Sequence, residues 1–214
     1  MSLKIPSRFG FYCVLTNPVK GYEYMTKLLT DMEFPFVQLR IKELPTEKVE
    51  MIALEMRKIT DGSKTRLIIN DDPHIARKTG ADGVHIGQND MSYGQVREIV
   101  GEESIIGIST HSPLQTMEAC SLKPDYIGIG PVFPTPTKKI PDPVIGVEGM
   151  KKMLSVATVP AVCIGGIDLS NLREVLGAGA QNFCMVRQLT SSDDPRGILG
   201  EMEFIYREFV SIRS

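Results

Sequence analysis

Cationic and amide side chains in this 214-residue chain gather in short segments whose spacing suits anion binding. Gln38, Arg40 and Lys42 alternate with apolar residues, and alternate side chains of an extended segment point to one face. A lysine or arginine that faces a protein interior is costly unless it has a partner. The spacing therefore predicts an anion site; the alternative is a solvated strand end with ordinary surface charges.

Two carboxylates offer a second kind of chemistry. Asp71 and Asp90 each follow a short apolar run, and neighbouring strands lie roughly 4.8 Å apart. Two carboxylates that close repel each other, whereas Mg2+ is commonly held by one or two carboxylates together with substrate phosphates. We therefore predict Asp71 and Asp90 as Mg2+ ligands. A helix cap is the alternative for Asp90, and for Asp72, just before Pro73, the cap is the better interpretation.

The histidines give a weaker signal. His85 lies inside an apolar run, where a histidine is usually a core residue with satisfied hydrogen bonds. His111 follows Ser109 and Thr110 in a polar turn and stays open as an acid–base candidate. No Ser-His-Asp or Cys-His spacing can be argued, so the sequence predicts no nucleophile.

These residues share one place in a repeating pattern of apolar runs and amphipathic stretches. The runs, short and rich in valine and isoleucine, are Phe11–Leu15, Phe36–Leu39, Leu67–Ile69, Gly83–Ile86, Ile105–Ile108, Tyr126–Ile129, Ala161–Ile164 and Phe183–Val186. Such runs fit parallel strands buried on both faces. Helical spacing in the stretches between them, for example Thr46–Ile59, indicates covering helices.

About eight strand–helix alternations, spaced by roughly 25 residues, predict a closed α/β barrel of the (β/α)8 TIM type. We expect one domain over residues 1–214, with strands from about 11 to 186 and a C-terminal helix at about 197–210. An open doubly wound sheet is the alternative. Because barrel chemistry collects after the C-terminal ends of the strands, the polar residues above are predicted to share one rim.

Two further loops belong to the same rim. The segment Gly130–Gly146 is rich in proline and carries threonines and lysines, which suits a lid over an anion; an ordinary surface loop is the alternative. Gly165 and Gly166 follow the seventh run, where glycines let backbone N–H groups approach a phosphate.

Composition excludes several classes of protein. At 42% apolar residues and a formal charge of −2, the chain fits a globular protein and shows no basic excess for nucleic acid or anionic lipid. No apolar run approaches the ~20 residues of a membrane span, and no secretory signal is evident. We expect a cytoplasmic protein, and a homo-oligomer is possible. Cys13, Cys120, Cys163 and Cys184 are expected to be buried reduced thiols.

The ordered motifs resemble those of the thiamine phosphate synthase family, from about Phe11 to Leu189. They are Gln-Leu-Arg-x-Lys at 38–42, Ile-Asn-Asp-Asp at 69–72, Gly-Ala-Asp-Gly-Val-His-Ile-Gly-Gln-x-Asp at 80–90, Gly-x-Ser-Thr-His at 107–111, the Pro-Val-Phe-Pro-Thr-x-Thr-Lys segment ending at 138, and Ile-Gly-Gly-Ile at 164–167. Each is modestly specific; together, in this order, they are highly specific.

The resemblance implies that 4-amino-2-methyl-5-hydroxymethylpyrimidine pyrophosphate is joined to a thiazole monophosphate, with loss of pyrophosphate first and Mg2+ as cofactor. It implies a pyrimidine pyrophosphate site made of Gln38, Arg40, Lys42, Asn70 and Lys138, with Ser109 near the pyrimidine. It also implies that Thr135, Thr137 and Gly166 bind the thiazole phosphate. Arg40, Lys42, Lys138 and Ser109 are the expected catalytic residues.

One position departs from the family pattern: Arg187 stands where the family usually has a serine that binds the thiazole phosphate. An arginine can grip phosphate with a bidentate fork, fill the pocket, or point outward, and the sequence leaves these open. Two rival functions remain: a thiazole tautomerase that uses His111, and an inactive barrel that binds thiazole or thiamine phosphate without turnover.

Overall fold

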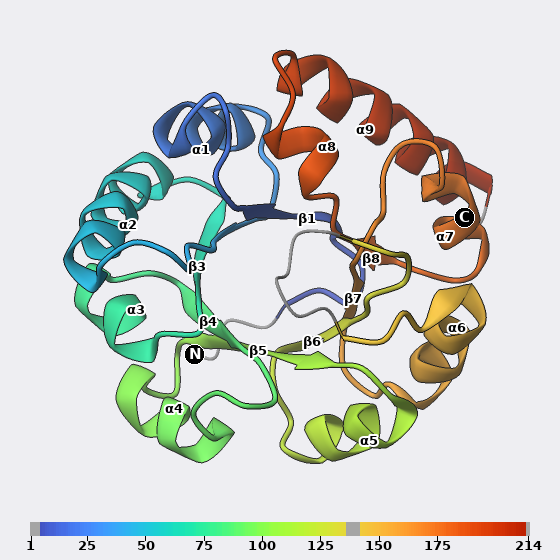
Figure 1. Ribbon diagram of the computed structural model, residues 1–214, viewed down its shortest axis with the longest axis horizontal. Helices are drawn as coiled ribbons and strands as arrows, with labels where there is room; N and C mark the ends of the chain where they lie inside the picture. The colour runs from blue at the N-terminus through green and yellow to red at the C-terminus, as the bar shows by residue number, and fades with distance from the viewer. Residues whose placement is uncertain (1–4, 136–141, 213–214) are drawn as a thin grey trace.

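The strands of this chain close into a ring. The structure is a computed structural model that describes residues 5–135 and 142–212. Strands β1 to β8 pair in sequence order, all in parallel, and β1 (Gly10–Leu15) pairs both with β2 and with β8. The predicted closed (β/α)8 barrel is therefore confirmed and the open sheet is excluded. Figure 1 looks into the ring of strands, with the helices around it.

The elements alternate from β1 to α8, and one further helix follows. The remaining strands are Phe36–Leu39 (β2), Arg66–Asn70 (β3), Gly83–Ile86 (β4), Ile105–Thr110 (β5), Tyr126–Ile129 (β6), Ala161–Cys163 (β7) and Asn182–Phe183 (β8). The helices are Tyr22–Asp31 (α1), Thr46–Thr60 (α2), Pro73–Thr79 (α3), Tyr93–Val100 (α4), Pro113–Ser121 (α5), Gly146–Val156 (α6), Leu172–Gly177 (α7), Arg187–Thr190 (α8) and Pro195–Ile212 (α9). None in the described ranges is long and apolar enough to cross a membrane.

Local sequence explains where α3 begins and ends. The Asp72 carboxylate accepts hydrogen bonds from the backbone N–H groups of His74 and Ile75, at 2.9 and 3.1 Å, and Pro73 occupies the first helical position. Gly80 ends the helix in the left-handed conformation, with φ of 68°. Asp72 is thus the predicted helix cap, and its carboxylate is engaged away from the neighbouring Asp71.

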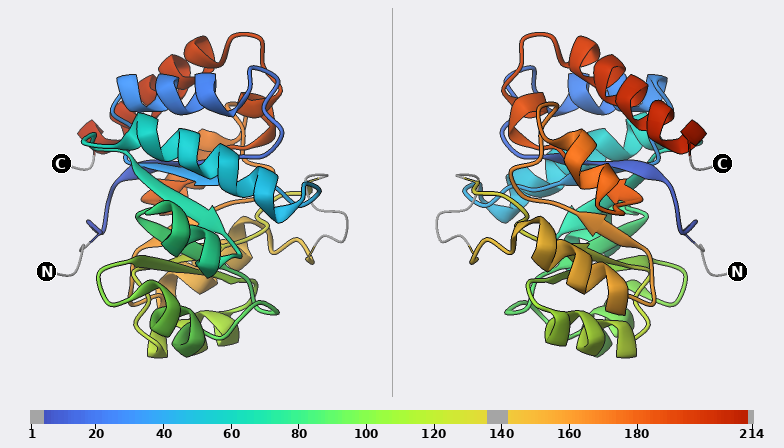
Figure 2. Two further views of the ribbon diagram at one scale, coloured as in Figure 1. Left: turned by 90° about the vertical axis from the view of Figure 1, so that its left-hand side faces the viewer. Right: turned by 90° about the vertical axis from the view of Figure 1, so that its right-hand side faces the viewer.

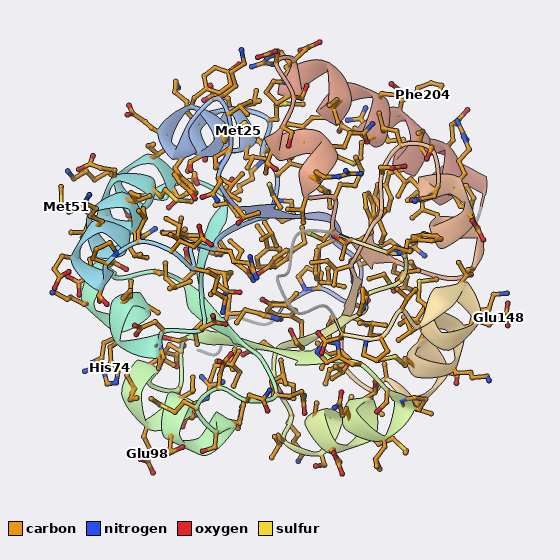
Figure 3. The ribbon with its side chains drawn as sticks, viewed as in Figure 1. Met25, Met51, His74, Glu98, Glu148 and Phe204 are labelled. Carbon is orange, nitrogen blue, oxygen red and sulfur yellow. The ribbon has the colours of Figure 1, made fainter. Side chains whose placement is uncertain are left out.

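Side chains divide into two apolar layers. One fills the ring itself, and its buried members are Tyr12, Val14, Phe36, Ile68, Ile105, Tyr126, Val162 and Cys184. The other lies between strands and helices, where for example Met25 of α1 is 1% exposed, whereas Met51 and Phe204 on the outer faces of their helices are 67% and 61% exposed. Figure 3 shows this arrangement. The four cysteines are free and buried, as the sequence predicts.

The N-terminal ends of the strands are held by fully engaged polar groups. Asn182 of β8 is buried, and its amide oxygen accepts the N–H groups of Phe9 and Gly10 while its amide nitrogen donates to the carbonyls of Ser7 and Ala161, all within 2.6–3.1 Å. Asn182 therefore fastens the N-terminal segment across the base of the barrel. This base lies opposite the end where α2 begins (Figure 2).

The last strand is shorter than predicted. The sequence suggests Phe183–Val186, but β8 ends at Phe183 and its final ladder contact is the Cys184 N–H, which donates to the Cys163 carbonyl at 2.9 Å. The Val186 carbonyl already accepts the N–H of Thr190, so the chain turns into α8 at that point. Arg187 consequently starts a short helix and does not end a strand.

Candidate active site

Most of the predicted functional residues meet at one rim of the barrel. Asn70 ends β3, Ser109 lies one residue before the end of β5, and Asp71, Asp90, Gly166 and Arg187 lie in the segments that follow β3, β4, β7 and β8. Gln38 on β2 is the exception, because it is buried and donates to Tyr12. The strands are paired side by side with Asn70 opposite His85 and Ser109 opposite Gly128. Parallel pairing therefore brings residues far apart in sequence to the same mouth. Thr137 and Lys138 lie outside the described residues.

The two predicted metal ligands influence each other electrostatically. Burial raises the pKa of Asp71 above its ordinary value of 3.8, the Lys42 ammonium opposes that rise, and the Asp90 carboxylate adds to it. The Asp71 backbone N–H donates to the His85 carbonyl at 2.7 Å, and its φ of 68° is unusual for a residue other than glycine. This strained backbone and the raised pKa are features that concentrate at functional sites.

Asp90 is oriented by the loop in which it lies. Its carboxylate accepts the N–H of Gly87 at 2.7 Å, which directs it back toward β4, and the side chain is exposed. It does not cap α4, because Ser92 does so with a reciprocal Gln95 contact. The alternative interpretation of Asp90 as a helix cap is therefore wrong.

The residues present fit a hard divalent cation. Within the described ranges, no group of three or more histidine, cysteine or acidic side chains forms a metal cluster, so the protein offers a pair of carboxylates here. Mg2+ commonly keeps several waters and is held by one or two carboxylates plus phosphate oxygens. Such a cation would offset the electrostatic repulsion between the Asp71 and Asp90 carboxylates.

The basic side chains differ in their partners. Lys42 is half-exposed and forms an ion pair with Asp71, whereas Arg40 is partly buried. Its backbone N–H donates to the Leu15 carbonyl at 3.0 Å, and its guanidinium has no carboxylate partner among residues 5–135 and 142–212. β2 ends at Leu39, so Lys42 of the predicted alternating trio lies beyond the paired strand. Arg40 is thus a cation at the mouth with its charge available.

The loops after β6 and β7 pack closely against each other. Gly165 and Gly166 have φ values of 102° and 63°, and a Cβ on Gly166 would lie 2.7 Å from both the Phe133 Cβ and the Pro134 oxygen. Phe133 N–H donates to the Gly165 carbonyl at 2.9 Å. Gly166 is therefore required for this approach, which places Thr135 beside the glycine turn that the sequence predicts as a phosphate cradle. The helix after it begins at Leu172.

His111 joins the two ends of the β6–α6 segment. Its Nδ1 lies 2.6 Å from the Gly130 carbonyl oxygen, so it donates there, and its Nε2 lies 3.5 Å from Asp142. Its backbone N–H donates to the Gln115 side chain at 2.8 Å. These contacts fix the position of His111 at the start of the loop, and the acid–base role left open by the sequence stays untested.

The barrel interior holds two tyrosines that sequence reasoning did not single out. Tyr12 and Tyr126 hydroxyls lie 2.6 Å apart; Gln38 donates to Tyr12 at 3.0 Å, and His85 lies 3.0 Å from Tyr126 and 2.8 Å from the Ser109 hydroxyl. His85 is a satisfied histidine, as predicted, and its partners include Tyr126 and Ser109. The inward positions of β1 and β6 were a usable signal, because hydroxyl-bearing side chains there need partners.

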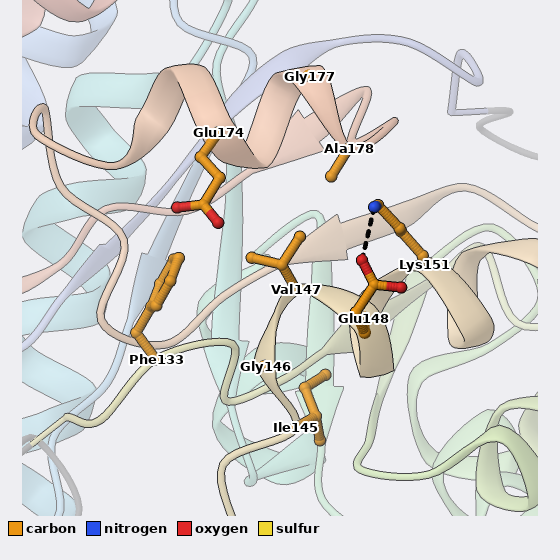
Figure 4. Close-up of a pocket in the computed structure, with 9 residues that line it drawn as sticks. All are labelled: Phe133, Ile145, Gly146, Val147, Glu148, Lys151, Glu174, Gly177 and Ala178. Carbon is orange, nitrogen blue, oxygen red and sulfur yellow. Dashed lines mark hydrogen bonds and ion pairs between the residues drawn. The ribbon is translucent and has the colours of Figure 1, made fainter.

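A separate groove lies outside the ring, between α6 and α7 (Figure 4). It has a volume of about 590 Å³, and its lining includes Phe133, Val147, Glu148, Lys151 and Glu174. The one ammonium in it is already bonded to Glu148 at 2.6 Å. Two carboxylates around a single paired amine disfavour a phosphate, so the anion chemistry belongs to the barrel mouth and not to this groove.

Comparison with known proteins gives a consistent result. The family model described as thiamine monophosphate synthase matches residues 16–189. The thiamine-phosphate synthases of Caldicellulosiruptor bescii and Clostridium botulinum strain Loch Maree are 37% and 39% identical to this chain, covering 86% and 87% of it and 84% and 92% of their own lengths. The structure of thiamine phosphate pyrophosphorylase from Pyrococcus furiosus superposes with a TM-score of 0.84 at 30% identity, covering 94% of this chain and 96% of that one.

Proposed function

The chain belongs to the thiamine monophosphate synthase family and is a transferase; we propose that it joins 4-amino-2-methyl-5-hydroxymethylpyrimidine pyrophosphate to a thiazole monophosphate in an Mg2+-dependent reaction. The observation that carries the substrate assignment is the electrostatics of the mouth. Asp90 raises the pKa of Asp71, and Arg40, which follows β2, has no carboxylate partner among the residues that the structure describes. A pyrophosphate together with a divalent cation satisfies both conditions.

The proposed reaction breaks a carbon–oxygen bond before it forms a carbon–nitrogen bond. Pyrophosphate leaves with the electron pair, the aminopyrimidine ring stabilises the methylene cation left behind, and the thiazole nitrogen supplies the electrons of the new bond. No proton has to be removed to make a nucleophile, which agrees with the lack of a predicted Ser-His-Asp arrangement. The task of the protein is to stabilise charge on the leaving group.

Each residue then has a specific task at the pyrophosphate. Asp71 and Asp90 would hold Mg2+, which would supply Lewis-acid stabilisation to the leaving group. Arg40 donates to the same group with its planar fork, and Asn70 adds an amide at the end of β3. Lys42 pairs with Asp71 in this structure, and we propose that its ammonium binds the pyrophosphate when the substrate is present. Lys138, outside the described residues, is proposed as a further cation.

The second substrate is proposed to lie toward β7 and β8. Thr135 and Gly166 belong to adjoining loops there, and Arg187 follows at the start of α8. We propose that a phosphate at this place accepts backbone N–H groups of the glycine turn. The Arg187 side chain is exposed. We propose that Arg187 replaces the usual serine as a phosphate ligand, with Thr137 as an additional contact.

The test is pyrophosphate release from purified protein with both substrates and Mg2+, each omitted in turn, with thiamine phosphate followed by chromatography. The expected result is that release and product both require all three. Pyrophosphate release without thiamine phosphate would contradict the thiazole half of the proposal. Absence of release, combined with thiazole isomerisation or with binding alone, would overturn it in favour of a tautomerase or an inactive binding barrel.

A further inference from the structure

Five side chains form one continuous hydrogen-bonded chain across the barrel. It runs from Gln38 on β2 through Tyr12 on β1, Tyr126 on β6 and His85 on β4 to Ser109 on β5, with contacts of 3.0, 2.6, 3.0 and 2.8 Å. The first three are at most 3% exposed, whereas His85 and Ser109 are only partly buried. The chain therefore begins in the closed interior and ends at the mouth.

Neighbouring glycines make room for this chain. The Tyr126 ring lies over Gly107, where an added Cβ would be 2.1 Å from the ring carbon that bears the hydroxyl. Gly128 faces His85, with 3.4 Å between the site of a Cβ and the imidazole Cε1. The His85 and Tyr126 rings stack with centroids 5.4 Å apart. Backbone and packing thus fix the rings, so the hydroxyl and imidazole protons are what remains to be arranged.

The buried end sets the direction of every bond in the chain. The Gln38 amide nitrogen only donates, so the Tyr12 oxygen accepts it and the Tyr12 proton is directed to Tyr126. Burial raises the pKa of both tyrosines, so each hydroxyl keeps its proton. In the reverse direction, Tyr12 would accept twice, and its own buried proton would have no acceptor among the side chains the structure describes.

The direction carries through to Ser109. Tyr126 uses its proton on Nδ1 of His85, which must then be an acceptor, so the imidazole proton resides on Nε2 and is donated to the Ser109 oxygen. Ser109 has already accepted a bond, and its own proton has no acceptor among the residues that the structure describes. We propose that this directed chain, with His85 as a positioning residue, holds Ser109 as a hydrogen-bond donor to a ring nitrogen of the aminopyrimidine.

The chemistry of the substrate agrees with that direction. The ring nitrogens of an aminopyrimidine accept hydrogen bonds and do not donate them, so only a serine with an uncommitted proton can hold one. The identity of the ring rests on the function proposed above. The direction of the chain does not, because it follows from contacts within the protein.

The first experiment reads the direction without any substrate. Protein labelled with 15N in its three histidines is examined by long-range 1H–15N correlation at neutral pH, and His85 is assigned by the loss of its signals in His85→Gln. The expected result is a protonated Nε2 and an unprotonated Nδ1. A protonated Nδ1 would reverse every bond in the chain, including the orientation of the Gln38 amide, and would overturn the proposal.

The second experiment tests the link to substrate with paired variants. A glutamine at position 85 can place its amide N–H close to where the imidazole Nε2–H lies, whereas an asparagine is too short to do so. His85→Gln is therefore expected to lower kcat/KM about fivefold, and His85→Asn about fiftyfold or more. Equal losses in the two variants would remove His85 from the positioning of Ser109. Melting temperatures of both variants show whether either loss comes from misfolding.

The third experiment removes one hydrogen bond at the buried end of the hydrogen-bonded chain. Tyr12→Phe removes the bond that transmits direction, so His85 is expected to populate both tautomers. The Michaelis constant for the pyrimidine pyrophosphate should rise about tenfold while that for the thiazole phosphate stays within twofold. Tyr206→Phe, at the base of the barrel, is the matched control. If wild-type His85 shows the expected tautomer but the protein makes no thiamine phosphate, the direction of the hydrogen bonds stands. Only the proposed function is then refuted.

Discussion

The two ends of this barrel use the same kinds of residue in opposite ways. At the base, Asp82 accepts the Leu67 N–H at 2.8 Å and lies 3.4 Å from Arg66, and Asp125 accepts the Ile106 N–H at 2.8 Å and lies 3.4 Å from Arg97. At the mouth, Asp71 lies near another carboxylate that raises its pKa further. The carboxylates at the base are paired with arginines, whereas Asp71 at the mouth, although it pairs with Lys42, also faces a second carboxylate.

Arg97 and Arg40 differ in the same way in the number of hydrogen-bond partners of their guanidinium groups. Arg97 donates to three backbone carbonyls between 2.6 and 3.3 Å and stacks on the Tyr93 ring at 5.5 Å. Arg40 has no side-chain hydrogen bond with the parts of the chain that the structure describes. A buried charge with all its partners contributes to the fold, whereas one at a concave mouth without them indicates a binding site.

The largest expected effect is on kcat, and it comes from replacing the carboxylates at the mouth. Asp71→Asn and Asp90→Asn should each lower kcat by at least about a hundredfold at saturating Mg2+, since metal stabilisation of a leaving group is worth several kcal/mol. Both variants should melt within a few degrees of the parent protein. Steady-state pyrophosphate release and thermal unfolding are the measurements.

The matched control is Asp82→Asn at the base. It should leave kcat unchanged and lower stability, because its ion pairs with Arg57 and Arg66 are lost. If Asp71→Asn and Asp82→Asn had the same effect on turnover, the assignment of Asp71 and Asp90 to the metal would be wrong.

A second prediction concerns the clasp at the base. Asn182→Ala should lower the free energy of unfolding by about 3 kcal/mol, because it leaves buried backbone groups of Phe9, Gly10 and Ala161 without their partner. Denaturant titration measures the loss, and kcat per folded molecule should not change. Gln181→Ala, at the exposed neighbouring position, is the control; a loss as large there would show that the clasp is not specific.

A third prediction sharpens the picture of the mouth. Arg187→Ala should raise the Michaelis constant for the thiazole phosphate about tenfold, the cost of one charge-assisted hydrogen bond, with little change for the pyrimidine pyrophosphate. Arg187→Ser restores the residue usual in the family and should recover part of the loss. An unchanged constant in Arg187→Ala would place the side chain outside the phosphate site.

The smallest effect comes from thiols that lie between the two ends. Burial raises the pKa of Cys163 and of Cys184 from 9.0 to about 12. The folded protein therefore holds protons that the unfolded chain releases, and stability should fall as the pH rises from about 9 toward 12. Denaturant titrations across this range in the parent and in Cys163→Ala measure it; a slope that is equal in both would exclude this thiol as a contributor.

The sequence predicted the barrel well because its strands are short apolar runs and its chemistry follows them. It also placed Asp71 and Asp90 correctly at one rim, since parallel pairing leaves little freedom there. It did not predict the Tyr12–Tyr126 contact, because a pair that is 114 residues apart in the chain leaves no local pattern. The start of α8 was missed as well, because Cys184 and Val186 look like strand residues until the Thr190 bond is seen.

The clasp formed by Asn182 also constrains the order in which the protein folds. Its bonds to Phe9 and Gly10 span 173 and 172 residues of chain, and β8, the strand that carries it, is the last to leave the ribosome. The N-terminal segment and β1 therefore lack this partner until the chain has been synthesised as far as residue 182. Closure of the barrel is a late event with a large entropic barrier, and a nascent chain halted before residue 182 exposes a sheet edge to which other chains can pair.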